Sequence, residues 1–374
     1  MDGVRALVVT DVVDSVLISA RLGDEQASRW WAAHHRLARD LLRRWRGREI
    51  DSSDGFLLMF EGVGDALQFA FEYHRAIADL QPPIQARVGV HAAPFVVREN
   101  SAEDVARGAK TLEIDGVAKM IAARTMAVAR GNQTLLTRET HDSMPAGPVR
   151  VVSHGHWRIK GIDEPIQLFA ASDDTVAIEP PPETEKAYRV VRSEDIWIPL
   201  REVRHSLLPE RDSFVGRQGA LHALRRSFEA GSRLVSVLGV GGVGKTRLAQ
   251  RFGWSCLGDF PGGVWFADLS QARTRDGICF ALAQSLDTIP GPSDDVSQLG
   301  KVLAGRGRCL VVLDNFEQVV KHAVDTVVPW LDMAPQAHFL VTSRENLSVP
   351  GEMVLRLGTL EHEDAEELFT RRAE

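Results

Sequence analysis

The sequence predicts an α/β protein with two domains, and three observations support this. The chain has 374 residues, whereas one domain usually has about 100–200. Strand-like apolar runs alternate with helix-length segments along most of the chain. Three consecutive prolines, Pro180 to Pro182, interrupt this alternation near the middle, and such a run fits neither a helix interior nor a central strand. With 44% hydrophobic and 25% charged residues, the composition is that of a folded protein.

The first domain is expected over about residues 1–170. Short apolar runs predict its strands, and apolar residues at helical spacing predict its helices. The expected elements are a strand at 4–9, a helix at 24–46, a hairpin at 50–60, a helix at 65–80, a strand at 84–91, a helix at 114–130 and a strand at 133–137. The dipeptide Asp54-Gly55 is typical of a hairpin turn. This order is that of the ferredoxin-like, split βαβ arrangement, which makes the domain α+β.

A linker is expected over residues 171–209, followed by a second domain over 210–374. Its predicted strands are residues 234–238, 264–269, 309–313 and 339–342, and a helix is predicted to begin at Lys245. Strands separated by helix-length segments indicate a parallel sheet that is covered on both faces.

Charge and cysteine content exclude several functional classes. The 51 acidic and 44 basic residues give a net charge of −7, which argues against a broad nucleic-acid-binding surface but not against a local phosphate site. No apolar run approaches the roughly 18–20 residues of a membrane span, so no membrane partner is expected. Three scattered cysteines argue against a disulfide framework or zinc site, so a cytoplasmic location is expected.

Residues 239–246 match the pattern G-x-x-x-x-G-K-[ST], between a predicted strand and a predicted helix. In this pattern, backbone N–H groups surround phosphate oxygens, Lys245 reaches the β- and γ-phosphates and Thr246 offers its hydroxyl to Mg²⁺. Asp314 ends a later apolar strand, where a second metal-coordinating carboxylate is required. The sequence therefore predicts an ATP site. The expected contacts are Gly239, Gly241, Gly242, Val243, Gly244, Lys245, Thr246, Arg247 and Asp314.

Three further segments, 214–217, 313–317 and 341–344, resemble the STAND class of P-loop ATPases, the NB-ARC-like regulators. This resemblance implies a parallel-sheet P-loop NTPase domain that acts as a nucleotide-dependent switch. It also implies that Val215, Gly216 and Arg217 line the adenine and that Arg344 senses the terminal phosphate.

Two features depart from that class. Asn315 stands where many such ATPases have a water-polarising glutamate, so slow hydrolysis is expected, with Glu317 as the alternative carboxylate. The sequence given ends at Glu374, just as a helix begins. The module is therefore expected to be C-terminally incomplete, either as a reduced switch or as a fragment of a longer regulator.

In the first domain, two acids stand out by position. Asp11 ends the first strand and Asp54 lies at the hairpin turn. The first strand of a split βαβ sheet lies beside the hairpin, so both carboxylates can converge. Two such acids suit a pair of hard cations that orient a nucleoside triphosphate. The alternative is two ordinary acids at strand and turn ends, where Asp is favoured for local hydrogen bonds.

The residues around these acids resemble the class III nucleotidyl cyclase domain over about residues 4–170. The resemblance rests on residues 10–15, 22–24, 53–57, 87–91, 122–124 and 155–162. It implies that Asp11 and Asp54 bind two Mg²⁺ or Mn²⁺ ions with the Val12 carbonyl. The ribose 3′-hydroxyl would then attack the α-phosphate of ATP and expel pyrophosphate. It further implies that Arg124 stabilises the transition state across a homodimer interface.

Three positions differ from the cyclase pattern and leave two hypotheses open. Asp51, Ser52 and Ser53 stand where the purine-reading Lys is expected, its partner Asp aligns near Val117, and the ribose-orienting Asn is Met120. A thioether cannot donate the hydrogen bond of an amide. The chain is therefore either an adenylyl cyclase joined to an ATP-binding switch or a catalytically degenerate, dimerising sensor with an ATP-binding regulator. In the second case it could be part of a transcriptional regulator.

Overall fold

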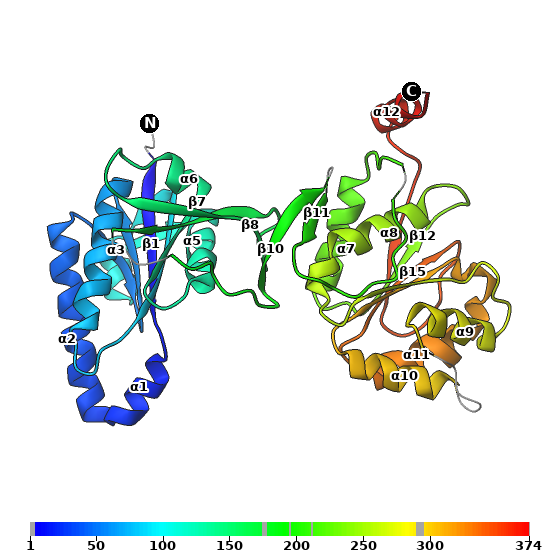
Figure 1. The fold of residues 1–374 in the computed structure, drawn as a ribbon, viewed down its shortest axis with the longest axis horizontal. Helices are drawn as coiled ribbons and strands as arrows, with labels where there is room; N and C mark the ends of the chain where they lie inside the picture. Colours follow the sequence, from blue (N-terminus) through cyan, green and yellow to red (C-terminus); the bar gives the residue numbers. More distant parts are fainter. Residues whose placement is uncertain (1–3, 174–177, 194–195, 211, 289–294, 374) are drawn as a thin grey trace. The chain divides into compact units, whose positions relative to one another are not determined.

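A computed structural model describes residues 4–173, 178–193, 196–210, 212–288 and 295–373 of the chain. These residues divide into two compact units, Met1–Val191 and Arg192–Glu374 (Figure 1). Each unit has a sheet and a hydrophobic core of its own. Among the residues described, no helix is long and apolar enough to cross a membrane.

The first unit is built on one mixed sheet, in which the strands follow the order β10-β8-β9-β7-β4-β1-β3-β2. The bounds are β1 (Arg5–Val12), β2 (Arg48–Ser52), β3 (Phe56–Phe60), β4 (Ala86–Ala93), β7 (Gln133–Thr137), β8 (Arg150–Ile159), β9 (Ile166–Ser172) and β10 (Ala187–Ser193). The segment β4-β1-β3-β2 is antiparallel throughout, as the split βαβ order predicts. A separate antiparallel pair contains β5 (Val96–Glu99) and β6 (Leu112–Asp115).

Helices cover both faces of this sheet. The helices of this unit are α1 (Ser15–Leu22), α2 (Asp24–Arg44), α3 (Val63–Ala78), α4 (Ala102–Ala106), α5 (Val117–Val128) and α6 (Arg138–Asp142). Alternate side chains of β1 point to opposite faces. Val8 packs in a cluster with Trp30 and Phe69 of α2 and α3, which lie side by side (Figure 1). Leu7 packs in another cluster with Ala122 of α5.

The second unit contains a parallel sheet with the order β13-β14-β15-β12-β16. Its strands are β12 (Leu234–Leu238), β13 (Val264–Asp268), β14 (Leu310–Asp314), β15 (His338–Ser343) and β16 (Glu352–Arg356). One core cluster joins the sheet to α7 (Gln218–Glu229) and α8 (Lys245–Ser255). The other joins it to α9 (Arg275–Ser285), α10 (Asp295–Arg306) and α11 (Ala323–Met333). The remaining elements are β11 (Ile196–Pro199), α12 (His362–Ala373) and the 3₁₀ turns η1 (Leu257–Asp259), η2 (Phe316–Gln318) and η3 (Val320–His322).

The predicted fold class is confirmed, most predicted bounds shift by one to a few residues, and three differences bear on the first unit. The helix predicted from residue 114 begins at Val117, because the residues before Gly116 pair as β6, and Gly116 has a φ of 112° that favours glycine. The first strand continues to Val12 and so includes Asp11. Within the predicted linker, residues 187–190 pair with β8, and residues 174–177 and 194–195 lie outside the described residues.

Candidate functional site

The β2–β3 hairpin turn lies directly against the end of β1. A Cβ atom on Gly55 would lie 1.9 Å from the carbonyl oxygen of Thr10 and 3.0 Å from Cα of Asp11. Only glycine therefore allows this approach. The backbone N–H of Phe56 donates to Thr10 Oγ1 at 3.0 Å, which fixes the turn from its other side. Asp54 precedes Gly55, so the structure brings Asp11 and Asp54 to the same edge of the sheet.

The two carboxylates interact electrostatically. Burial raises the pKa of Asp11, the Arg87 guanidinium opposes this rise, and the charge of Asp54 adds to it. Nη1 of Arg87 lies 3.8 Å from Oδ2 of Asp11. Asp54 accepts hydrogen bonds from the hydroxyls of Ser15 and Ser53, each at 3.0 Å. Two oxygen donors with like charges at one site are a donor set that a hard divalent cation stabilises.

Arg124, the other side chain expected to act at this site, makes no described contact with the two acids. Arg124 is exposed on α5 and its Nη2 lies 3.4 Å from the position of a Cβ on Gly161. In the described ranges, the structure gives no hydrogen bond or ion pair between Arg124 and either acid. Val117 and Met120 of α5 are exposed at 63% and 38%, whereas Val12 is buried. The role of Arg124 at the acid pair therefore stays a prediction.

Beneath the acid pair lies a buried polar network that sequence reasoning missed. Nε2 of His34 and the hydroxyl of Tyr73 are 2.7 Å apart, and both side chains are fully buried. Tyr73 also hydrogen-bonds Thr10, and burial raises the pKa of Tyr73 strongly. Because Thr10 precedes Asp11 and binds the hairpin, this network holds together the two backbone segments that carry the acids. Its members lie on three elements, so no local motif indicates it.

The buried histidine gives the unit a pH-dependent stability. Burial, and secondarily the charge of His35, lower the pKa of His34 from 6.5 to about 4. Between pH 4 and pH 6.5 the unfolded chain binds more protons than the folded chain. The contribution of His34 to the free energy of unfolding is therefore fully present above pH 6.5 and is lost as the pH falls toward 4. Urea unfolding should give a free energy about 2 kcal/mol lower at pH 5 than at pH 7 from this residue. His34→Gln should reduce the pH dependence by this amount, and the buried His74, whose pKa burial also lowers to about 4, should account for a further part. The partly exposed control His141→Gln should keep the contribution of His34; equal slopes in both variants would contradict the assignment.

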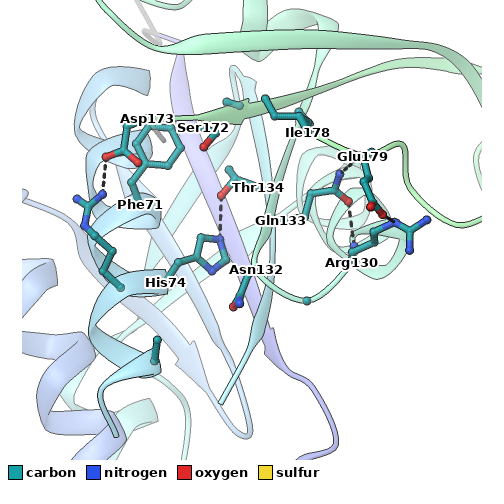
Figure 2. A pocket seen from close by; sticks show the side chains of 15 residues that line it. Phe71, His74, Arg130, Asn132, Gln133, Thr134, Ser172, Asp173, Ile178 and Glu179 are labelled. Carbon is teal, nitrogen blue, oxygen red and sulfur yellow. Dashed lines mark hydrogen bonds and ion pairs between the residues drawn. The ribbon is translucent and has the colours of Figure 1, made fainter. Parts of the chain in front are cut away.

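A separate cavity of about 730 Å³ lies in the first unit, between α3, β7 and β9. Figure 2 shows His74 and Thr134 within it, with Nε2 of His74 3.0 Å from Thr134 Oγ1. At its edge, Arg75 is paired with Asp173 at 2.6 Å. Its lining includes none of the predicted site residues. Four separate segments form it, which explains why no sequence pattern indicated it.

In the second unit, the predicted phosphate loop joins β12 to α8. Gly242 and Gly244 adopt φ angles of 79° and 98°, which favour glycine. The buried Lys245 side chain curls back into the loop, where Nζ donates to the carbonyls of Gly239 and Val240 at 2.9 and 3.1 Å. This loop lies at the carboxyl edge of the parallel sheet, where open α/β folds bind their ligands.

Asp314 lies at the same edge and is 1% exposed. Thr246 Oγ1 donates to its carboxylate at 2.9 Å, and Thr342 of β15 also donates to it. Burial raises the pKa of Asp314, the two hydroxyl bonds lower it, and the charges of Asp268 and Glu317 raise it. Thr246 and Asp314 are thus brought together as the motif predicts. Oxygen donors of this kind suit Mg²⁺.

The residues expected around the adenine are connected to the loop. Arg217 donates to the carbonyl of Val243 at 3.1 Å and to that of Gly358 at 2.8 Å. Val215 is buried, and Gly216 lies against the side chain of Asp364.

Arg247, which was expected to contact the nucleotide, points elsewhere. Its guanidinium donates to the carbonyls of Asp212 and Ser213 at 3.1 and 2.8 Å. The side chain therefore holds the segment before Val215 in place, and a phosphate contact by Arg247 remains a prediction.

Arg344 follows β15 and lies across the phosphate loop. A Cβ on Gly241 would lie 3.2 Å from its Nη2. Its Nε also pairs with Oε1 of Glu317 at 3.0 Å. The predicted phosphate sensor is thus adjacent to the loop, and Glu317 is beside it.

Comparison with known proteins gives the second unit a family. Residues 219–374 form an NB-ARC domain. An uncharacterised protein of Mycobacterium tuberculosis is 33% identical over 174 residues, which cover 46% of this chain and 44% of that protein. A putative HTH-type transcriptional regulator of the same species is 35% identical over 150 residues, covering 40% and 17%. The regulatory protein AfsR of Streptomyces griseus is 31% identical over 162 residues, covering 38% and 16%. The chain thus spans less than half the length of these relatives.

Solved cyclase structures are similar to part of the chain. Adenylate cyclases from Trypanosoma brucei, described in their monomeric state, match 45% of this chain and 89% of theirs, with 22% identity and a TM-score of 0.41. The adenylyl cyclase CyaB from P. aeruginosa matches 47% of this chain and 97% of its own, with 14% identity and a TM-score of 0.42.

Proposed function

We propose that this NB-ARC-containing chain is a nucleotide signalling protein with two ATP sites. The first unit converts ATP to cyclic AMP and pyrophosphate, and the second binds ATP as a regulatory switch. The observation that carries the first half is the contact of the hairpin turn with β1, which brings Asp54 to Asp11. In the reaction the ribose 3′-oxygen bonds to the α-phosphorus, the bond to the pyrophosphate oxygen breaks and its electron pair leaves with pyrophosphate, and the hydroxyl proton passes to water.

The donor set of the first site fits divalent metal ions. Asp11 and Asp54 offer hard oxygen ligands. The negative charge of Asp54 raises the pKa of Asp11 because the two carboxylates repel each other, and a bound cation relieves this repulsion. Asp11, Asp54 and the carbonyl of Val12 would hold Mg²⁺ or Mn²⁺. Bound there, such ions supply neutralisation of phosphate charge and activation of a hydroxyl nucleophile. Ser15 and Ser53 orient the Asp54 carboxylate for this role.

Arg124 acts in this proposal from the partner of a homodimer. Its exposure on α5, which leaves the guanidinium accessible to a second copy of the chain, supports a site shared between two copies. A guanidinium presents several donors in one plane to the phosphate oxygens of the transition state.

Mixing two inactive variants tests the shared site. Asp54→Asn and Arg124→Ala should each be inactive with ATP and Mn²⁺. In a C2 dimer, an equimolar mixture should recover roughly a quarter of wild-type cyclic AMP formation, because half of the dimers contain one intact site. Chromatographic measurement of cyclic AMP checks this. A mixture as inactive as either variant alone would contradict a site shared in this way.

A second candidate is a catalytically degenerate sensor, and Met120 favours it. Met120 stands on α5 one helical turn before Arg124 and offers no amide for the ribose. In this case the first unit binds nucleotide and dimerises without turnover. The assay with wild-type protein separates the two candidates: cyclic AMP above the Asp54→Asn level supports the enzyme, and equal levels support the sensor.

The second unit is proposed to bind ATP through its phosphate loop. Lys245 and Arg344 supply positive charge on either side of the loop, and Thr246 with Asp314 supplies the oxygen donors for Mg²⁺. Binding requires Lys245 to exchange its bonds to loop carbonyls for bonds to phosphate. This exchange links nucleotide occupancy to the loop conformation, as a switch requires.

A further inference from the structure

The cavity between α3, β7 and β9 has the size and the lining of a small-molecule site. Its volume of about 730 Å³ lies within the range of roughly 300–1,000 Å³ that is usual for ligand pockets. Small side chains keep it open, because Ala78, Ala170 and Ala171 lie where larger residues would fill the space. Phe71 and Ile178 add larger apolar surfaces to its wall (Figure 2). A ligand that fits this lining therefore has an apolar body.

The charged groups that line the cavity neutralise one another. Arg75 pairs with Asp173 at 2.6 Å, and Arg130 pairs with Glu179 at 3.6 Å. Figure 2 shows Asp173 at one side of the cavity, and Glu179 with Arg130 at the other. Among the described residues that line it, these four side chains are the charged ones. A charged ligand would have to displace one of these partners or remain unpaired, so the lining favours an uncharged molecule.

His74 supplies a polar contact in this lining. Its Nε2 lies 3.0 Å from Thr134 Oγ1, whereas its Nδ1 is buried and has no hydrogen-bond partner among the described residues. Burial lowers the pKa of His74 to about 4, so the ring is neutral at pH 7 and carries one N–H. A hydroxyl suits such a ring, because it can donate or accept whichever nitrogen carries the proton.

The cavity also contacts the segment that leads from β9 to β10. Nε of Arg130 donates to the carbonyl of Pro180, and Nε2 of Gln133 donates to the carbonyl of Glu179, both at 2.8 Å. Ile178 and Glu179 of this segment line the cavity. A molecule in the cavity therefore adds contacts to the part of the segment that these two hydrogen bonds hold.

We propose that this cavity binds an uncharged small molecule with an apolar body and a hydroxyl group, and that the bound molecule holds residues 178–180 against the first unit. The apolar body lies against Phe71 and Ile178, and the hydroxyl pairs with His74. The cavity is separate from both proposed nucleotide sites, because none of their residues lines it. Ligand binding here therefore does not depend on either of those sites.

Titration of 2-naphthol into the full chain tests the site, since this probe is uncharged at pH 7 and has one hydroxyl on an apolar ring system. Calorimetry should show saturable binding with a dissociation constant of about 0.1–1 mM, the range for a ligand of this size. Naphthalene-2-sulfonate has the same rings with a negative charge and should bind at least roughly tenfold more weakly. Equal affinity for the two probes would contradict a site for uncharged ligands.

Saturating ATP with Mg²⁺ should leave the binding of 2-naphthol unchanged. Displacement of the probe by ATP would mean that the probe occupies a nucleotide site, and the cavity would then have no ligand. This arm distinguishes failure of the cavity from failure of the proposed ATP sites, whose own variants are assayed without 2-naphthol.

Variants locate the bound probe. Ala78→Trp adds a large ring to the lining from an exposed position of α3, and should weaken 2-naphthol binding at least roughly tenfold because the two compete for the same space. Ala32→Trp makes the same change at an exposed position of α2 outside the cavity and should bind as the wild type does. His74→Gln can keep a bond to Thr134 but lacks the second ring nitrogen, so it should bind roughly tenfold more weakly. Wild-type affinity in both Ala78→Trp and His74→Gln would overturn the site.

Hydrogen exchange tests the effect on the segment between β9 and β10. Saturating 2-naphthol should slow amide exchange in the peptide that covers residues 178–186 at least about threefold. A peptide from β12 in the second unit is the control and should not change. Binding of the probe without this protection would show that the ligand does not hold residues 178–180.

Discussion

Replacing Asp54 by asparagine is expected to reduce cyclic AMP formation at least roughly 100-fold, because an oriented transition-state contact is typically worth 10²–10³ in rate. The substitution is nearly isosteric, and the amide oxygen can still accept from Ser15 or Ser53. Gly55 and its contact with β1 are unchanged. The loss therefore reports the missing negative charge rather than a displaced turn. Purified protein with ATP and Mn²⁺, analysed by chromatography, gives the measurement.

The charge argument also predicts how Asp54→Asn affects its neighbour. Since Asp54 raises the pKa of Asp11, the variant should bind Mn²⁺ more weakly even though Asp11 becomes easier to ionise. The manganese concentration for half-maximal activity should rise, and Asp11→Asn should give a similar loss. Because the two acids act as a unit, the double variant should lose little more than either single one.

A matched control is Asp79→Asn, which removes an exposed carboxylate from the end of α3 in the same unit. It should leave cyclic AMP formation unchanged. Equal activity of the Asp54 and Asp79 variants would show that the acid pair does not catalyse the reaction, and the sensor hypothesis would then be the better account of the first unit.

Much of the fold could be predicted because its signals are local. The strands at 133–137 and 234–238 have the predicted bounds, since each is a short segment rich in β-branched or apolar residues. The position of Asp54 beside Asp11 followed from the order of elements, which places the first strand next to the hairpin. Sequence reasoning missed β6 because its four residues neither form a buried run nor alternate clearly.

The parts that could not be predicted depend on partners far apart in the chain. His34 and Tyr73 are 39 positions apart, and neither lies in a motif. The role of Gly55 could not be predicted either, because glycine is common in hairpin turns. The requirement for glycine comes from the neighbouring strand, where the carbonyl oxygen of Thr10 would lie 1.9 Å from a Cβ at this position. Packing rather than local preference decides such contacts.

The phosphate loop illustrates the same division. The motif indicated Lys245, Thr246 and Asp314, because backbone phosphate binding restricts residue types over a short segment. The motif could not indicate that the amide of Asn315 is occupied by Asp268 and Asp314, or that Arg344 from another strand pairs with Glu317. The orientation of Arg247 away from the loop likewise depends on residues 212–213.

Replacing Lys245 by alanine is expected to weaken ATP binding by the second unit roughly 100-fold. The ammonium would form charge-assisted bonds to the β- and γ-phosphates, each worth about 1.5–3 kcal/mol. In the free protein the same group donates to the carbonyls of Gly239 and Val240, and those bonds are given up on binding. The net loss is therefore about 3 kcal/mol, which corresponds to a factor of roughly 100 in the dissociation constant.

The measurement must separate this site from the acid pair, which also binds ATP in our proposal. Titration of a fluorescent ATP analogue into the Asp54→Asn background isolates the second unit. Lys301→Ala, which removes an exposed lysine from α10, is the matched control and should bind as its parent does. If Lys245→Ala and Lys301→Ala have equal affinity, the loop does not hold the phosphates. The carbonyl bonds of Lys245 would then serve only to fix the loop, and the free protein should lose thermal stability in Lys245→Ala alone.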